Sequence, residues 1–299
     1  MIKNKAIDRI FTVSLIAFIF FIIAIFVLNN NDIDIVNDEY DNCNSVIYTI
    51  NDDNYVVPVM VYIDNNKSLE DKVYDLLNMM IKENNKNYLL PSYFSPILPN
   101  GTEINDVILD NDILKIYFSK ELLEITENQS SKMIESLIYT LTEFDEVLGI
   151  EIYVDNSMLK YIPNSSISLP TILTRDYGIN KIYDLNSNLD IKKIYLSYYD
   201  NSNPVIITKY LNDDREEIEI IVEELSNYSY LNNIISYMNN NIVLNSYSIN
   251  SDSIDIVFNE SFNDNMLLEQ LSNSIFLNYD KNTIRFISNE EVFYEFNKN

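Results

Sequence analysis

The chain has 299 residues and a formal net charge of −26, and it contains no histidine and one cysteine, Cys43. A surface this acidic repels phosphate backbones, so we predict no nucleic-acid partner. The missing histidine excludes Ser-His-Asp and Cys-His nucleophile systems and removes a common metal ligand, while a lone cysteine makes an intrachain disulfide impossible.

The first element in chain order is an apolar run near the N-terminus. Residues 11–28 are apolar apart from Thr12 and Ser14, which is close to the roughly 20 residues that cross a bilayer core. Three basic residues precede the run: Lys3, Lys5 and Arg9. We therefore predict a transmembrane anchor over residues 10–28 and a cytoplasmic N-terminus over residues 1–9. This makes the chain a single-pass cell-membrane protein with extracytoplasmic C-terminal domains.

A cleaved signal peptide is the competing interpretation of this run. The following "VLNNNDID" offers no small-x-small cleavage site. The residues before Cys43 do not fit lipoprotein processing either. Residues 29–45 are polar and acidic, so they are predicted to form a spacer.

The remainder of the chain repeats one pattern. A strand-like triplet recurs at one constant offset: Leu114, Ile116 and Phe118 correspond to Ile254, Ile256 and Phe258. A helix-like set recurs at a slightly shorter constant offset: Met133, Ile134, Leu137 and Leu141 correspond to Leu267, Leu268, Leu271 and Ile275. Self-similarity of this kind indicates two copies of one structural unit, and the shorter offset indicates a shorter loop in the second copy.

The earlier part of each copy is an apolar extended run, a polar break and an amphipathic helix. In the first copy Leu69, Val73 and Leu76 follow helical spacing, and Ser68 is a predicted N-cap. In the second copy Asp213 or Asp214 is the predicted cap. Each copy then contains a hairpin, which turns at "DND" in the first copy and at "NSDS" in the second.

The order in each copy is therefore strand, helix, strand, strand, helix, strand. This predicts an α+β fold in which an N-terminal transmembrane helix precedes two tandem two-layer α/β sandwiches. The predicted domains are residues 46–162 and 191–299. Between them, residues 163–190 contain Pro163, Pro170 and Gly178 and form a connector that we expect to dock on one or both domains.

The first copy resembles a known family. It contains "LPNGT", a strand that ends in "FS", and a helix that ends in "TLTEF". The matching residues are Leu98, Pro99, Gly101, Thr102, Phe118, Ser119 and Thr140 to Phe144. This pattern is similar to the GerMN domain of GerM-like sporulation and spore-germination proteins, which are bacterial. The second copy lacks the signature and is a degenerate version.

The resemblance implies a non-enzymatic cell-envelope protein that acts through protein–protein interaction, with a fold similar to ring-building motifs. Its expected partners are envelope or sporulation proteins of a channel-type complex between mother cell and forespore, besides the membrane through the N-terminal helix. No small-molecule substrate is expected. The alternative is an extracytoplasmic module that binds a cell-wall glycan or cations, which a ligand screen by thermal shift would distinguish.

Acidic residues are the remaining candidates for chemistry. Glu143 lies between the predicted helix and the next strand, and Glu151 lies in that strand. To act as paired catalytic carboxylates they would need a cleft and perturbed pKa values. In a chain with 46 acidic residues such neighbours arise by chance, and Thr142 and Glu143 are explained by hydrogen bonding at the helix end. We therefore assign no catalytic, cofactor-binding or metal-ligating residue and expect no cofactor.

Overall fold

The computed structural model describes residues 43–84, 90–91, 93–186, 190–200, 203–227 and 233–298. The chain divides into two compact units, and the larger one comprises Val46–Val59 and Asn65–Asn299. In the smaller unit the side-chain amide of Asn44 donates to the carbonyl of Ile63 at 2.8 Å. The backbone N–H of Ile63 returns a bond to Asn44 Oδ1 at 3.0 Å.

The first copy begins with a hairpin, whereas we predicted a single strand. Strands β1 (Ser45–Asn51) and β2 (Val56–Val61) are neighbours, and β3 (Phe94–Ser95) pairs antiparallel with β1, so the order is β2-β1-β3. Asn54 has a positive φ of 65° in the turn between β1 and β2. Asparagine tolerates this conformation, which is why the chain reverses there.

Helix α3 (Leu69–Met80) confirms the predicted amphipathic helix. The hydroxyl of Ser68 accepts the backbone N–H of Asp71 at 3.2 Å, so Ser68 is the N-cap as predicted. The face that carries Val73 and Leu77 is buried.

A four-stranded sheet with the order β4-β5-β6-β7 completes the first copy. Strands β4 and β5 form the predicted hairpin, and α4 crosses over from β5 to the parallel strand β6. Its elements are β4 (Ile104–Asp110), β5 (Ile113–Phe118), the short 3₁₀ helix η2 (Lys120–Glu124), α4 (Glu127–Leu141), β6 (Gly149–Val154) and β7 (Ser157–Met158). The first copy thus has two sheets, β2-β1-β3 and β4-β5-β6-β7, where we predicted one, and the short strand β7 follows β6 as an unpredicted antiparallel neighbour.

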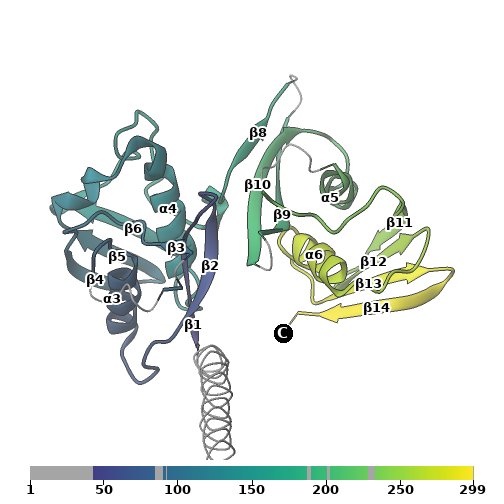
Figure 1. Cartoon of the computed structure of the whole chain (residues 1–299), viewed down its shortest axis with the longest axis horizontal. Helices are drawn as coiled ribbons and strands as arrows, with labels where there is room; N and C mark the ends of the chain where they lie inside the picture. Colours follow the sequence, from purple (N-terminus) through teal and green to yellow (C-terminus); the bar gives the residue numbers. More distant parts are fainter. Residues whose placement is uncertain are drawn as a thin grey trace, which may run out of the picture. The chain divides into compact units, whose positions relative to one another are not determined.

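The second copy has the same arrangement (Figure 1). A long hairpin of β9 and β10 opens it, α5 and α6 both contact β9, and the second sheet has the order β11-β12-β13-β14. Its elements are β9 (Ile191–Asp200), β10 (Asn203–Asn212), α5 (Glu217–Ser226), β11 (Leu244–Ile249), β12 (Ser253–Phe258), α6 (Asn265–Phe276), β13 (Thr283–Ser288) and β14 (Glu291–Asn297).

The repetition extends to irregularities. The register of β4 on β5 shifts between Ile104 and Asp106, and that of β11 on β12 shifts between Leu244 and Ser246. These two shifts have the same offset as the strand residues of the repeat. A bulge bends and twists a strand in a specific way, so its recurrence at one position indicates one backbone design used twice.

The predicted repeat residues form the cores. Phe118 and Phe258 are 0% and 1% exposed, and the other members of the two strand triplets, Leu114, Ile116, Ile254 and Ile256, are 0% exposed. The apolar faces of α4 and α6 pack over them, with Met133 and Leu267 at 0% and 2% exposure. The apolar residues that the strand and helix spacings identified in the sequence therefore form the core of each copy.

The predicted cap of α5 is wrong. The helix begins at Glu217, and its N-cap residue Glu216 makes no side-chain capping bond. The carboxylate of Asp213 instead accepts the backbone N–H of Arg215 at 2.9 Å and also binds the Arg215 guanidinium. An arginine two positions further on competes for the aspartate, which keeps the aspartate outside the helix.

The connector contains the 3₁₀ turn η3 (Arg175–Tyr177) and strand β8 (Ile182–Asp184). Leu173 forms an isolated antiparallel bridge with Ile150 of β6. Strand β8 pairs parallel with β10, so the second hairpin becomes a sheet with the order β8-β10-β9. The connector therefore makes backbone contacts with both copies.

The predicted membrane anchor is corrected. Residues 10–28 lie outside the residues that the structure describes, and no described helix is long and apolar enough to cross a membrane. The helix α4, with 15 residues, is about 22 Å long against a hydrocarbon core of about 30 Å. This finding contradicts the transmembrane helix in our predicted fold class and the single-pass cell-membrane localisation, and neither is carried further.

Candidate functional site

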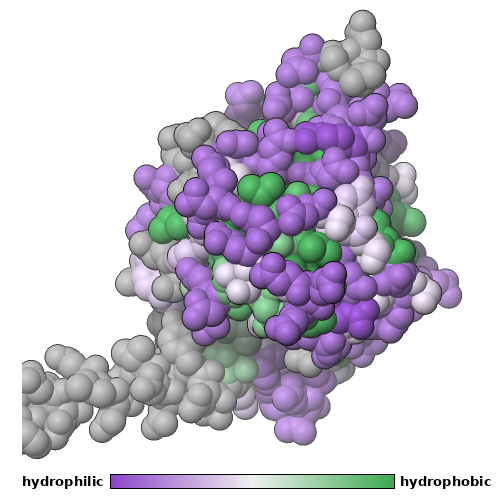
Figure 2. All heavy atoms as spheres, turned by 90° about the vertical axis from the view of Figure 1, so that its right-hand side faces the viewer, coloured by the Kyte–Doolittle hydropathy of each residue, from purple (hydrophilic) through white to green (hydrophobic). Residues whose placement is uncertain are grey.

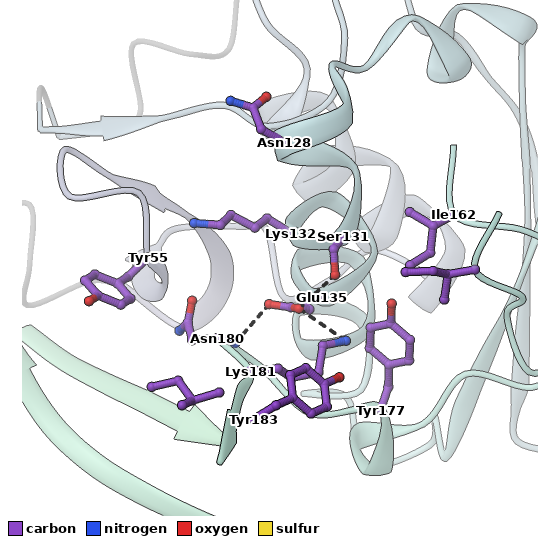
Figure 3. A pocket seen from close by; sticks show the side chains of 12 residues that line it. Tyr55, Asn128, Ser131, Lys132, Glu135, Ile162, Tyr177, Asn180, Lys181 and Tyr183 are labelled. Atoms are coloured by element: carbon purple, nitrogen blue, oxygen red, sulfur yellow. Dashed lines mark hydrogen bonds and ion pairs between the residues drawn. The ribbon is translucent and has the colours of Figure 1, made fainter. Parts of the chain in front are cut away.

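A cavity of about 730 Å³ lies where α4 meets the connector (Figure 3). Volumes of this size are usual for ligand pockets. The α4 side chains come from one helix face. The connector contributes Ile167, Tyr177 of η3, the turn before β8, and β8 itself. Lining residues that bear on its chemistry include Tyr55, Lys132, Glu135, Tyr177, Asn180 and Lys181.

Glu135 is the buried carboxylate of this cavity, with 3% of its surface exposed. It accepts the backbone N–H of Asn180 at 2.9 Å and the hydroxyl of Ser131 at 3.2 Å. The ammonium of Lys181 lies 3.3 Å from Glu135 Oε1 and forms an ion pair with it. A buried carboxylate requires such partners, because an unpaired charge in the interior is strongly destabilising. Through its bonds to Asn180 and Lys181, Glu135 attaches the connector to α4.

Asn180 connects three segments. Its side-chain Oδ1 accepts the backbone N–H of Val56 at 2.8 Å, and its Nδ2 donates to the carbonyls of Val56 at 2.8 Å and Ile206 at 2.9 Å. Its φ of 46° lies in the left-handed region, which asparagine adopts more readily than most residues. One connector side chain therefore binds β2 of the first copy and β10 of the second.

Two lysines bring positive charge to the cavity. The ammonium of Lys181 lies 3.3 Å from the ring centroid of Tyr177, in addition to its ion pair. Burial lowers the pKa of both Lys181 and Lys132, and nearby Glu135 opposes the shift. Within the described part of the chain Lys132 has no hydrogen bond or ion pair. Figure 3 shows it extending from α4 toward the side of Tyr55.

The Tyr177 hydroxyl is buried and makes no hydrogen bond of ordinary geometry within the described ranges. Burial raises the pKa of the Tyr177 phenol to about 12, and Ser131 opposes the shift. Among the described residues, the cavity thus combines the Lys132 ammonium, which has no ion pair of its own, with the buried Tyr177 hydroxyl and a carboxylate that already has three partners.

The "TLTEF" residues of the family resemblance hold segments together. Thr140 Oγ1 accepts the backbone N–H of Tyr48 at 2.8 Å in a buried bond. The hydroxyl of Thr142 donates to the carbonyl of Ile138 at 2.7 Å, as expected at a helix end, and accepts from Arg175 Nε at 2.9 Å. These threonines attach β1 and the connector to the end of α4.

Glu143 and Glu151 do not line the cavity. Glu143 accepts the Tyr48 hydroxyl at 3.1 Å and forms an ion pair with Arg175. Glu151 accepts the Tyr153 hydroxyl at 2.7 Å. The helix-end explanation of Glu143 is therefore incomplete, because its side chain binds β1 and the connector. Among the described residues, no group of three or more acidic or cysteine side chains is placed to hold a metal.

The "LPNGT" residues are structural as well. Leu98 is 0% exposed, and its backbone N–H donates to the Met80 carbonyl at 2.8 Å. Gly101 has a φ of 78° in the predicted turn, and the hydroxyl of Thr102 donates to the Pro99 carbonyl at 2.8 Å. This segment closes the C-terminal end of α3 and directs the chain into β4.

Glu135, Asn180 and Lys181 were not predicted from the sequence. A signal existed for Glu135, because Ile138 and Tyr139 follow it at helical spacings of three and four, which places a charged residue on a face that is otherwise buried. Asn180 and Lys181 gave no such signal, since their role depends on the path of the connector.

Comparison with known proteins supports the fold. Residues 46–160 match the family model Germane, "Sporulation and spore germination". A curated relative, the spore germination protein GerM of Bacillus subtilis (strain 168), is 23% identical over 186 residues, which covers 60% of this chain and 50% of the relative. The match thus spans about half the length of that relative.

Two solved structures are also similar. The tandem GerMN domains of the sporulation protein GerM from Bacillus subtilis superpose with a TM-score of 0.74 at 20% identity, covering 83% of this chain and 91% of that one. The first GerMN domain of the same protein gives a TM-score of 0.41 at 23% identity, covering 44% of this chain and 97% of that one.

Proposed function

Because the chain belongs to the GerMN family and has two tandem domains of that fold, we propose that it is a non-enzymatic protein of sporulation or spore germination. In this proposal the protein acts by binding other proteins. The observation that carries this proposal is the likeness to tandem GerMN domains, which extends over both copies and most of each chain.

The chemistry of the cavity is consistent with a contact role. Its carboxylate, Glu135, is held by Asn180, Ser131 and Lys181. A general acid or base must exchange its proton with a substrate, and a carboxylate with three fixed partners is poorly placed to do so. The chain also has no histidine to act in its place.

We propose that the partners are proteins of an envelope complex, such as a channel between mother cell and forespore. This partner class and the likeness to ring-building motifs stay predictions. Figure 2 shows a mainly hydrophilic face with separate apolar spots. A face of this kind suits regulated or specific contacts more than a large permanent apolar interface.

Gene deletion in the native host tests the role. We expect fewer heat-resistant or germinating spores in the deletion strain, and recovery when the wild-type gene is returned. Unchanged spore counts and germination would reject a role in either process.

A double variant, Glu143→Gln with Glu151→Gln, tests the non-enzymatic part. Glu143 binds Tyr48 and Arg175, and Glu151 binds Tyr153. Ion pairs near the surface contribute about 1 kcal/mol or less, so the variant should fold and restore sporulation. A variant that is folded by circular dichroism and still fails to restore it would favour catalysis by these residues.

A further inference from the structure

We infer that the cavity beside α4 binds an extended acidic peptide segment of a partner protein, with a peptide carboxylate on Lys132 and the peptide backbone along the open edge of β8. This inference rests on the proposed contact function and names the class of partner. The inference is tested by peptide binding to the purified protein, whereas the role in sporulation is tested by gene deletion. A negative binding result would therefore reject the inference without rejecting that role.

Charge is the first argument. The chain has 46 acidic and 20 basic residues, yet the cavity is lined by two lysines and a single carboxylate. Glu135, which also lies near Lys132, is already paired with Lys181 at 3.3 Å. The ammonium of Lys132 therefore has no ion pair of its own among the described residues. A partly buried ammonium is stabilised by a carboxylate that forms a charge-assisted hydrogen bond.

The sheet edge is the second argument. Strand β8 lies at the end of the order β8-β10-β9, so among the described strands it pairs on one side only, with β10. Its residues Ile182 and Tyr183 line the cavity together with Lys181. An edge strand presents backbone N–H and C=O groups that an added strand can bind. A sugar or a small anion would use the lysine and leave this edge unused.

The walls are the third argument. Ile162 and Ile167 line the cavity together with the lysines, and Tyr183 is 63% exposed on the edge strand. Side chains of an extended peptide alternate in direction, so an acidic residue on Lys132 places its neighbours toward these apolar and aromatic groups. The site therefore fits alternating acidic and aliphatic residues.

The test is a binding titration of the full-length chain by isothermal calorimetry. The probe is a terminally blocked pentapeptide that alternates valine and aspartate, and the matched peptide has asparagine in place of aspartate. We expect the aspartate peptide to bind about tenfold or more tightly than the asparagine peptide, since hydrogen bonds to charged groups have that effect.

Protein variants assign the contact to Lys132. The variant Lys132→Ala should weaken binding of the aspartate peptide about tenfold and leave the asparagine peptide unchanged. Lys120→Ala removes the same charge from an exposed residue of η2 outside the cavity, and this variant should bind as wild type does. Equal losses in both variants would mean general attraction, and no loss in Lys132→Ala would reject the site.

Two N-methylated peptides test the strand edge. Methyl groups are placed on alternate amides, on the odd residues in one peptide and on the even residues in the other. Strand addition uses the amides of one side only, so one peptide should lose binding and the other should keep it. Equal binding of both peptides, stronger binding of N-acetylmuramic acid than of the peptide, or no peptide binding at millimolar concentration would overturn the inference.

Discussion

Thr140 and Ser274 occupy the same place in the two copies and accept the same hydrogen bond. Thr140 Oγ1 accepts the backbone N–H of Tyr48 on β1 at 2.8 Å, and Ser274 Oγ accepts the backbone N–H of Ser197 on β9 at 2.9 Å. Both bonds are buried and join the crossover helix to the first hairpin. The second copy has lost the family signature in sequence while keeping this contact.

Replacing Thr140 tests this attachment. Thr140→Val preserves shape and removes the acceptor, which leaves a buried N–H of Tyr48 unpaired. We expect the free energy of unfolding to fall by about 1–3 kcal/mol in urea titrations. Thr140→Ser keeps the hydroxyl and should lose less. A threonine-to-valine variant as stable as the wild type would show that the bond is unimportant.

The buried ion pair of the cavity gives a second prediction. Glu135→Leu leaves the Lys181 ammonium and the Asn180 N–H without their acceptor, and removal of one partner of a buried pair costs about 3–5 kcal/mol. Glu135→Gln retains an acceptor oxygen and should lose less. The control Glu151→Gln, whose only side-chain hydrogen bond in the described structure is with Tyr153, should stay within about 0.5 kcal/mol of wild type. Equal losses in all three variants of the chain, measured by urea titration, would contradict this ranking.

The repeat could be predicted because it depends on local periodicity. The apolar spacing of Leu114, Ile116 and Phe118, and of their counterparts in the second copy, indicated the strands and their inward face. The hairpin at Asn111 and Asp112 also follows from local chemistry, since both residues have positive φ values of 49° and 65°.

The leading hairpins and the division of the sheet could not be predicted in the same way. Pairing of β1 with β3 joins Ile50 to Ser95 across a helix, and short apolar runs do not specify their partners. The cavity depends on similar long-range pairing, because Asn180 reaches Glu135 from a distant part of the sequence. The sequence contains these residues, but only the path of the connector brings them together.

Alkaline pH should destabilise the fold through buried tyrosines. Burial raises the pKa of Tyr177 to about 12 in the folded state, whereas an unfolded tyrosine titrates near 10. Between these values the unfolded chain binds fewer protons than the folded chain, so stability is complete below about pH 10 and falls as pH rises toward 12.

Tyr177→Phe removes this contribution, so its loss of stability between pH 9 and pH 11.5 should be smaller than that of wild type. The difference is up to about 1.4 kcal/mol for each pH unit above 10. Tyr62→Phe replaces a tyrosine that is 58% exposed and serves as the control, with a wild-type profile. Parallel profiles for Tyr177→Phe and wild type, followed by urea titration at each pH, would rule out Tyr177 as a source.

Asn180 gives the last prediction, which separates its hydrogen bonds from its backbone conformation. Asn180→Gly tolerates the φ of 46° and removes three side-chain bonds to Val56 and Ile206. We expect a loss of about 2–4 kcal/mol in the free energy of unfolding, since each bond contributes about 1 kcal/mol and buried groups are left unpaired. Asn289→Gly has a similar φ of 51° in an exposed turn and should be nearly neutral.

Asn180→Asp gives the sharper result, although it differs from asparagine by one group. Its carboxylate keeps the acceptor for the Val56 N–H but turns an oxygen toward the carbonyls of Val56 and Ile206, where the amide had donated. Repulsion replaces two hydrogen bonds in a buried place, so the aspartate variant should be at least as unstable as the glycine variant. An aspartate variant within about 0.5 kcal/mol of wild type by urea titration would show that the amide nitrogen does not join β2 to β10.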